Sequence, residues 1–227
     1  MDKVEYYKIE KMSYSEYCEY LQDKYGIGDY DYMTPKFTKV NKVSRTSEGL
    51  YAHHKMEILV PSLSEPKWAV KFPWEFQAKE NIVYCDLLEH LYMYVLIAEE
   101  TEPKLRYICG FGGVVDYFLP ELNDLYSGWE SSQKWRRTCH SKIKDDREVY
   151  LIILERFMTW WYEMNMKPEE SMFDVRFNTG LLKTSLGKRN GSWNDFRNKE
   201  IYRDIDKIVD KILEYAKLRK DVGCCWV

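Results

Sequence analysis

The chain has 227 residues, of which 45% are hydrophobic and 31% are charged, a composition that excludes an intrinsically disordered protein. Its formal net charge of −3 at pH 7 argues against a protein that coats nucleic acid without specificity, although a local basic cleft remains compatible with it. The sequence shows no signal peptide, membrane-spanning run or CxxC pair. We therefore expect a soluble, cytoplasmic protein with reduced cysteines, no membrane partner and no zinc knuckle.

The first third of the chain predicts one helix and one strand. Residues 13–24 begin with a serine that is followed three positions later by a glutamate, a pair typical of a capped helix start. The segment GLYAHHKMEILV, residues 49–60, places β-favouring residues on both sides of two histidines and predicts a strand or hairpin. Three prolines within residues 61–77 then allow only short helical pieces.

The rest of the chain predicts long helices. Apolar residues recur at helical spacing from about residue 80 to residue 100, with Asn81 as the expected N-cap of that helix. The same pattern is found in residues 147–164 and in about 195–219. The glycine-rich segment 107–118 lacks the spacing of a phosphate-binding loop, so we interpret it as a turn between packed elements.

Three of the four histidines fall within about forty residues, around one asparagine. His53 and His54 lie in the predicted strand, and His90 follows Asn81 by nine positions. A divalent cation on a scissile phosphate needs a few rigid ligands and a nearby base that activates water, and neutral imidazole serves both purposes. Each histidine by itself has an ordinary structural explanation. Their joint placement beside a helix start, which favours phosphate, points to a phosphodiester-cleaving site.

The pattern H-H … N-I-V-Y-C-D-L-L-E-H resembles the signature of the HNH nucleases, a ββα-metal finger. In that family an Asp-His or His-His dipeptide ends the first strand, an asparagine follows in the loop, and a histidine lies nine positions later on the helix. The resemblance covers about residues 50–97, under a quarter of the chain. The stretch between the histidine pair and the asparagine is longer here than in compact members of the family.

The resemblance implies a role for each of these residues. His54 resembles the general base that activates water, and His53 and His90 resemble the metal ligands. Asn81 resembles the residue that orients the base or touches the metal. The implied cofactor is a divalent metal ion, with Mg²⁺ ahead of Mn²⁺. The implied reaction is hydrolysis of a DNA phosphodiester bond that leaves 5′-phosphate and 3′-hydroxyl ends.

Three carboxylates near the histidines are candidates to orient an imidazole by accepting its second N–H group. Glu57 and Asp86 are the better candidates, and Glu89 is the poorest because it points away from His90 on a helix. With the resemblance, the expected fold is a mostly helical α+β protein. It would have an N-terminal helical and polar segment (1–49), a ββα-metal core (50–100) and a mainly helical region (101–227) that takes part in substrate recognition.

Two basic segments are candidates for holding DNA, although basic segments are more often solvated surface. The first is KWRRTCHSKIK, residues 134–144, in which we expect His140 to lie at the surface. The second spans residues 183–199, and we favour it because its residue types suit phosphates and base edges. Its candidate nucleic-acid-binding residues are Lys183, Lys188, Arg189, Asn190, Trp193 and Arg197.

These observations predict a metal-dependent HNH-type endonuclease acting on DNA, of the restriction type or related to phages or mobile elements, because the body is much larger than the catalytic finger. The predicted long helices and the aromatic content of 16% are compatible with a homodimer, which cutting both strands would favour. Two alternatives stay open. One is a non-catalytic nucleic-acid or protein binding module on an HNH-like scaffold, and the other is a structural or phage-accessory protein whose histidines belong to the core.

Overall fold

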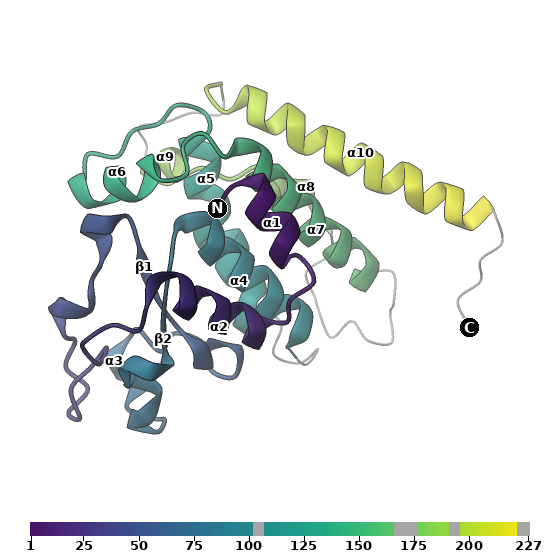
Figure 1. Ribbon diagram of the computed structural model, residues 1–227. Helices are drawn as coiled ribbons and strands as arrows, with labels where there is room; N and C mark the ends of the chain where they lie inside the picture. Colours follow the sequence, from purple (N-terminus) through teal and green to yellow (C-terminus); the bar gives the residue numbers. More distant parts are fainter. Residues whose placement is uncertain (102–106, 166–176, 191–195, 222–227) are drawn as a thin grey trace.

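The computed structural model of the chain describes residues 1–101, 107–165, 177–190 and 196–221. It is mostly helical, with one small sheet in which β1 (Tyr51–His54) pairs antiparallel with β2 (Ile82–Cys85), and this confirms the α+β class (Figure 1). The described α-helices are α1 (Lys3–Ile9), α2 (Tyr14–Tyr25), α3 (Pro66–Ala69), α4 (Leu87–Glu100), α5 (Leu119–Leu125), α6 (Lys134–Ser141), α7 (Arg147–Asn165), α8 (Thr179–Leu182), α9 (Leu186–Asn190) and α10 (Lys199–Asp221). Shorter turns are η1 (Asn41–Val43), η2 (Thr46–Glu48), η3 (Lys55–Ile58), η4 (Trp74–Gln77), η5 (Lys79–Asn81), η6 (Tyr107–Phe111) and η7 (Val114–Phe118).

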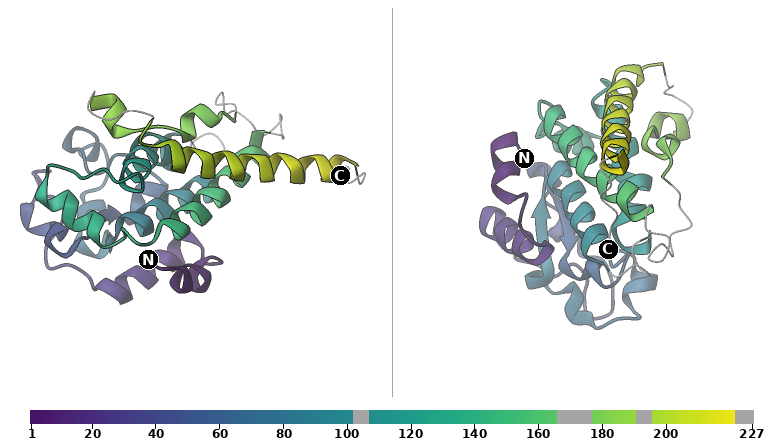
Figure 2. Two further views of the ribbon diagram at one scale, coloured as in Figure 1. Left: turned by 90° about the horizontal axis from the view of Figure 1, so that it is seen from above. Right: turned by 90° about the vertical axis from the view of Figure 1, so that its right-hand side faces the viewer.

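Helix α4 lies in the middle of the molecule, with α2 and the sheet on one side and α7 on the other (Figures 1 and 2). Its side chains are apolar almost all round, and Leu88, Val95 and Ile97 have no exposed surface. Burial of each such side chain contributes about 1.5–3 kcal/mol relative to leaving it exposed. The packing around α4 therefore fixes the position of the polar residues that this helix carries, His90 among them.

Helix α4 begins at Leu87, and its N-cap lies five residues later than the expected N-cap at Asn81. The N-cap is Asp86, whose carboxylate accepts the backbone N–H of Glu89 at 2.8 Å, while the Glu89 carboxylate accepts the backbone N–H of Asp86 at 2.6 Å. Residues 82–85, which the sequence pattern assigned to the helix, form β2 instead. A short apolar run does not by itself distinguish a buried strand from a buried helix, and the capping box at residues 86–89 marks the true start.

The other predicted elements agree more closely with the structure. Helix α2 carries the expected capping box at Ser13 and ends at Gly26, which has a positive φ of 76°. The pieces between residues 61 and 77 are short, as the prolines predict. Helices α7 and α10 lie where the apolar spacing places them, although residue 195, at the expected start of the last helix, is outside the described residues.

The glycine-rich segment 107–118 is a turn at one point only. Gly110 has a φ of 99°, and a Cβ atom there would lie 2.5 Å from the backbone nitrogen of Ala98 on α4. From Val114 onward the chain is helical through η7 into α5, so the prediction of a simple turn is wrong for this part. The glycine lets the backbone pass close to α4 and brings η7 against the same helix.

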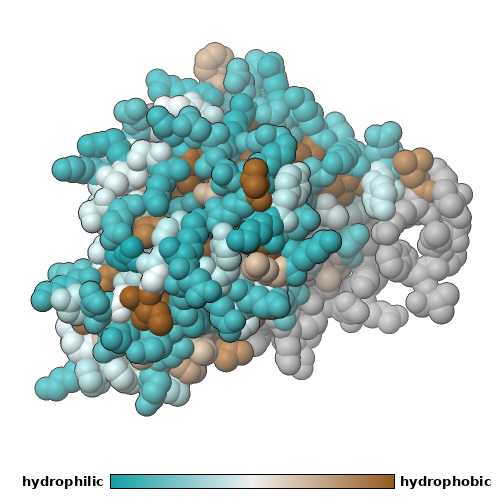
Figure 3. All heavy atoms as spheres, viewed as in Figure 1, coloured by the Kyte–Doolittle hydropathy of each residue, from teal (hydrophilic) through white to brown (hydrophobic). Residues whose placement is uncertain are grey.

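The surface seen in Figure 3 is largely hydrophilic, and its apolar residues lie in small groups among polar ones. The apolar residues Ile201 and Ile205 of α10 are buried, which agrees with the stripe of helical period in the sequence. Among the described residues, no helix is both long and apolar enough to cross a membrane.

Candidate functional site

Strand β1 turns its two histidines to opposite faces, because successive side chains on a strand alternate. His53 faces α4, where its Nδ1 lies 3.0 Å from Nε2 of His90. His54 faces away, and its Nε2 lies 3.1 Å from Oε1 of Gln77. The His54 ring also packs on Tyr32, with 4.3 Å between the ring centroids. The structure therefore brings His53 and His90 together and holds the His54 side chain elsewhere.

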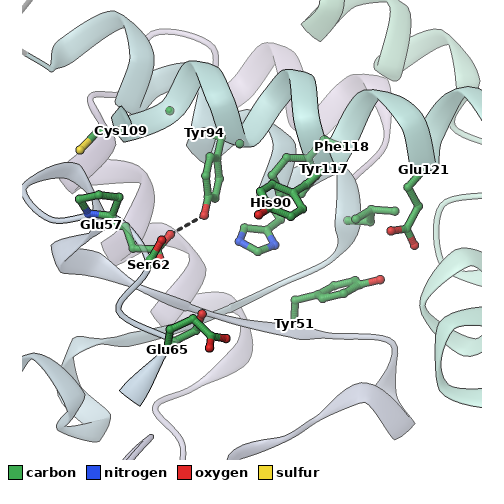
Figure 4. A pocket seen from close by; sticks show the side chains of 15 residues that line it. Tyr51, Glu57, Ser62, Glu65, His90, Tyr94, Cys109, Tyr117, Phe118 and Glu121 are labelled. Atoms are coloured by element: carbon green, nitrogen blue, oxygen red, sulfur yellow. Dashed lines mark hydrogen bonds between the residues drawn. The ribbon is translucent and has the colours of Figure 1, made fainter. Parts of the chain in front are cut away.

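A pocket of about 390 Å³ opens beside His90, which is half-buried in its wall (Figure 4). Aromatic rings surround the imidazole, with centroid distances of 5.9 Å to Tyr51, 5.3 Å to Tyr94 and 4.9 Å to Phe118. The polar lining includes three carboxylates, from Glu57, Glu65 and Glu121. Such a pocket, with an apolar wall and a few convergent polar groups, is the kind of cavity that holds a ligand.

Glu57 is a buried carboxylate at this pocket. Tyr94 donates its hydroxyl proton to Oε2 of Glu57 at 2.5 Å, and the same oxygen lies 3.6 Å from Nδ1 of His53. Burial raises the pKa of Glu57 to about 7, and the hydrogen bond from Tyr94 offsets part of that rise. Glu57 is therefore a group that exchanges a proton near neutral pH inside the pocket.

Tyr14, at the start of α2, holds the other side of the His53 ring. Its hydroxyl oxygen lies 2.7 Å from Nε2 of His53 and 3.1 Å from the backbone carbonyl of Lys55. If the Tyr14 hydroxyl donates to that carbonyl, it accepts Nε2–H of His53 and leaves Nδ1 unprotonated, an assignment from the hydrogen-bond network. Sequence reasoning missed Tyr14, because one tyrosine among 19 carries no signal before its contact with residue 53 is known.

Both imidazoles of the pair are neutral at neutral pH. Burial lowers the pKa of His90 to about 3, and burial together with the neighbouring histidines lowers the pKa of His53 well below its ordinary value. Their nitrogens are thus available as lone-pair donors. A separation of 3.0 Å is close to that of two ligands at a right angle on a cation with bonds of about 2.1 Å.

The pair fits a divalent cation as two of its ligands, with Glu57 nearby as a third donor. Among the described residues, no three His, Cys, Asp or Glu side chains already stand in the arrangement of a metal site. Glu57 has to swing from Tyr94 toward the pair to complete a three-ligand set.

Asn81 and Asp86, which were expected near the histidines, are engaged elsewhere. Asn81 donates its side-chain amide to the backbone carbonyl of Glu75 at 2.7 Å. The Asp86 carboxylate caps α4 as described above. Glu89, the poorest candidate for orienting a histidine, accepts from Lys24 Nζ at 2.6 Å. Of the predicted supporting carboxylates, Glu57 is the one that the structure places next to His53.

The favoured basic segment 183–199 is partly neutralised in the structure. Lys183 forms an ion pair with Asp206, and the Arg189 guanidinium lies 3.8 Å from the Asp116 carboxylate and donates to the Asp116 backbone carbonyl at 2.6 Å. Trp193 and the side chain of Asn190 lie outside the described residues, and Lys188 and Arg197 are exposed.

His140, in the other basic segment, is buried rather than at the surface, with 4% of the residue exposed. Its Nε2 donates to Oε1 of Glu121 at 2.7 Å. The surface prediction was wrong because His140 packs against Glu121 of α5 and lies 6.0 Å from the Trp129 ring, contacts that the sequence of α6 does not reveal.

Comparison of the chain with protein-family models, with curated proteins and with solved structures found no match. The resemblance to HNH nucleases therefore rests on the residues of this chain alone. What the geometry adds is the convergence of a strand histidine and a helix histidine beside an open pocket.

Proposed function

We propose that the protein is a metal-dependent endonuclease of the HNH type that hydrolyses DNA phosphodiester bonds. The observation that carries the proposal is the approach of His53 on β1 to His90 on α4, with 3.0 Å between their facing nitrogens. His90 lies in the wall of an open pocket, and His53 lies directly behind it. The order of elements, two antiparallel strands followed by a helix, also supports it.

His53 and His90 would hold the cation, and Glu57 beside them would serve either as a third ligand or as the general base. When bound, the ion polarises the scissile phosphate and stabilises the charge that develops on it. The chain's own contribution is to keep both imidazoles neutral by burial and to hold the His53 ring through Tyr14. Because imidazole is a better ligand for Mn²⁺, Ni²⁺ or Zn²⁺ than for Mg²⁺, we expect the transition metals to bind more tightly.

Two residues are candidates for the general base, which contributes about 10²–10⁴-fold to rate. His54 is the candidate that the family resemblance implies, and it has to leave Gln77 to reach the pocket. Glu57 already lines the pocket and has a pKa of about 7, so its carboxylate form accepts a proton from water near neutral pH. Loss of cleavage in His54→Ala but not in Glu57→Gln would assign the base to His54. Loss of cleavage in Glu57→Gln alone, with the Mn²⁺ affinity of the wild type retained, would assign the base to Glu57.

The test is cleavage of supercoiled plasmid DNA with Mg²⁺, Mn²⁺, Ni²⁺, Zn²⁺ or EDTA, for the wild type, His53→Ala and His90→Ala. We expect metal-dependent nicking or discrete fragments that both variants lose. Because a buried histidine variant can misfold, the melting temperature of the wild type with and without each ion is the second readout. A cation at 100 times its dissociation constant stabilises the fold by about 2.7 kcal/mol.

A non-catalytic binding module is the second candidate function. It is favoured by the contacts that hold His54 on Gln77 and Asn81 on Glu75, away from the pocket. DNA binding without cleavage by any of the ions would support this module. No cleavage and an unchanged melting temperature with every ion would leave the three histidines a structural role and overturn the nuclease.

A further inference from the structure

We propose that helix α6 and the turn after it bind the phosphate backbone of the nucleic-acid substrate beside the pocket. This inference deepens the proposed function and rests on it. It replaces segment 183–199, which the sequence favours, with segment 134–144. The reasons are the position of α6 at the pocket, the charges that it leaves uncompensated, and its exposed indole ring.

Helix α6 borders the pocket through Trp135 and Arg136, in addition to His140. The Trp135 ring lies 6.3 Å from the Tyr51 ring, and Nε of Arg136 lies 3.2 Å from Oε1 of Glu121. Tyr51 and Glu121 both line the pocket, and Figure 4 shows them on the side of the cavity opposite Glu57. A strand whose scissile phosphate lies at His90 would therefore run past the start of α6.

The exposed cations of α6 and of the turn after it have no acidic partner among the described residues. Lys134, Arg137 and Lys144 are exposed, and in the part of the chain that the structure describes none of them pairs with a carboxylate. The Arg137 guanidinium donates to the backbone carbonyls of Ser131 at 2.7 Å and Ser132 at 2.8 Å. These bonds fix the side chain without cancelling its charge, so it is held ready for a phosphate.

The two basic segments differ in whether these cations already have an acidic partner. Lys183 and Arg189 each have an acidic partner, Asp206 and Asp116, which a phosphate would have to displace. Lys134 and Arg137 lie three positions apart on one side of α6 and present their charges together. Phosphate contacts gain most from cations that lose no ion pair on binding, and this favours α6.

The carboxylates of the pocket strengthen the preference for this side. Anionic phosphates are repelled by Glu57, Glu65 and Glu121, all of which line the cavity. Glu121 is the one that α6 covers, since it accepts from His140 at 2.7 Å and lies beside Arg136. The α6 side is therefore where a phosphate backbone meets the least uncompensated negative charge.

Trp135 adds a surface for a base. The residue is 39% exposed, and the Arg136 guanidinium lies 5.0 Å from the centre of its ring. Cations interleaved with exposed aromatic rings are typical of surfaces that follow a nucleic-acid strand, because every base has a face that stacks.

The experiment compares two double variants with the same change of net charge. Lys134→Gln/Arg137→Gln removes one lysine and one arginine from α6, and Lys183→Gln/Arg189→Gln removes one of each from the other segment. Dissociation constants for a fluorescein-labelled DNA duplex are measured by anisotropy in EDTA between 50 and 200 mM KCl, so that no cleavage takes place. We expect the α6 variant to bind more weakly and its slope of log K against log [KCl] to fall by about 0.9 for each lost phosphate contact.

Lys183→Gln/Arg189→Gln is the control variant and should keep the wild-type slope of log K against log [KCl]. Equal losses in both variants would indicate an effect of net charge alone and overturn the inference, as would a larger loss in the control. Arg137→Lys keeps the positive charge but removes the guanidinium that bonds to Ser131 and Ser132. This variant should keep most of the salt dependence, which separates the effect of charge from an effect of the lost hydrogen bonds on folding. A wild type that binds no DNA overturns both proposals, whereas α6-dependent binding without metal-dependent cleavage supports α6 and overturns the nuclease.

Discussion

Two tyrosines on α2, Tyr14 and Tyr17, differ in whether their hydroxyl groups contact a histidine of the site. Both are buried, with 3% and 0% of their surface exposed. The Tyr14 hydroxyl contacts His53, whereas in the described part of the chain the Tyr17 hydroxyl has no hydrogen-bond partner. A metal-binding imidazole usually gives its second N–H to an acceptor that fixes the tautomer and the ring orientation. Tyr14 occupies that place for His53.

Tyr14→Phe removes this acceptor and should lower the affinity for Mn²⁺ by about 10–100-fold. It should also cost about 1–3 kcal/mol of stability, because Nε2–H of His53 is left buried without a partner. Isothermal titration with Mn²⁺ and urea unfolding in EDTA measure the two effects. Tyr17→Phe, on the same helix, is the matched control and should leave the metal affinity unchanged. Equal Mn²⁺ affinities for Tyr14→Phe and the wild type would show that Tyr14 does not position His53.

The burial of His54 leads us to expect a loss of stability in mild acid. Burial lowers its pKa to about 4, and the hydrogen bond to Gln77 offsets part of that decrease. The unfolded chain, with an ordinary histidine pKa near 6.5, therefore binds the proton first as the pH falls. The contribution of His54 to the free energy of unfolding is complete above about pH 6.5. It decreases by about 1.4 kcal/mol for each pH unit toward pH 4.

His54→Gln keeps a hydrogen-bond donor for Gln77 and removes the titration. Urea unfolding in EDTA at pH 7, 6 and 5 gives the free energy of unfolding of both proteins. We expect the difference in free energy of unfolding between the wild type and His54→Gln to decrease as the pH falls. A constant difference across this range would mean that the imidazole is not held neutral.

At the scale of elements, the sequence predicts the helices that a local residue pattern defines. It does not predict features that depend on contacts between residues far apart in the chain. The capping box of α2 and the apolar stripes of α7 and α10 follow from spacing. Of the four side chains expected to converge, His53 and His90 do so, whereas His54 and Asn81 are held elsewhere. Strand β2 was missed because four apolar residues before α4 fit either structure. Tyr14 and the buried position of His140 were missed because they depend on partners far away in the chain.

The close passage of η6 over α4 gives a prediction at this scale. Gly110 and Gly128 both have positive φ, 99° and 86°, which costs alanine about 1–2 kcal/mol at either position. A Cβ at Gly128 meets nothing within 4 Å, whereas one at Gly110 lies 2.5 Å from a backbone atom of Ala98. Urea unfolding should therefore show a clearly larger loss of stability for Gly110→Ala than for Gly128→Ala. Equal losses would mean that η6 can move away from α4 at little cost.

At the scale of the whole molecule, the segment that resembles the nuclease finger shares the main hydrophobic core with the rest of the described chain. One hydrophobic cluster joins buried residues of α1, α2, α4, α7 and α10, and so includes residues from all three parts expected from the sequence. The pair of histidines is likewise supported from outside residues 50–97, by Tyr14 on one side and Phe118 on the other. The geometry of the pocket thus belongs to the complete fold.

The two-stranded sheet also has a consequence for which histidine serves the pocket. β1 and β2 are joined by four residue pairs, among them His53 with Val83 and His54 with Ile82. A slip of one residue turns every side chain of a strand to the other face. A β1 slipped by one residue toward its start would bring His54 to the place of His53, facing His90, and would turn His53 to the other face of the sheet. The register of this short sheet, fixed by four residue pairs, therefore determines which of the two adjacent imidazoles lies against His90 beside the pocket.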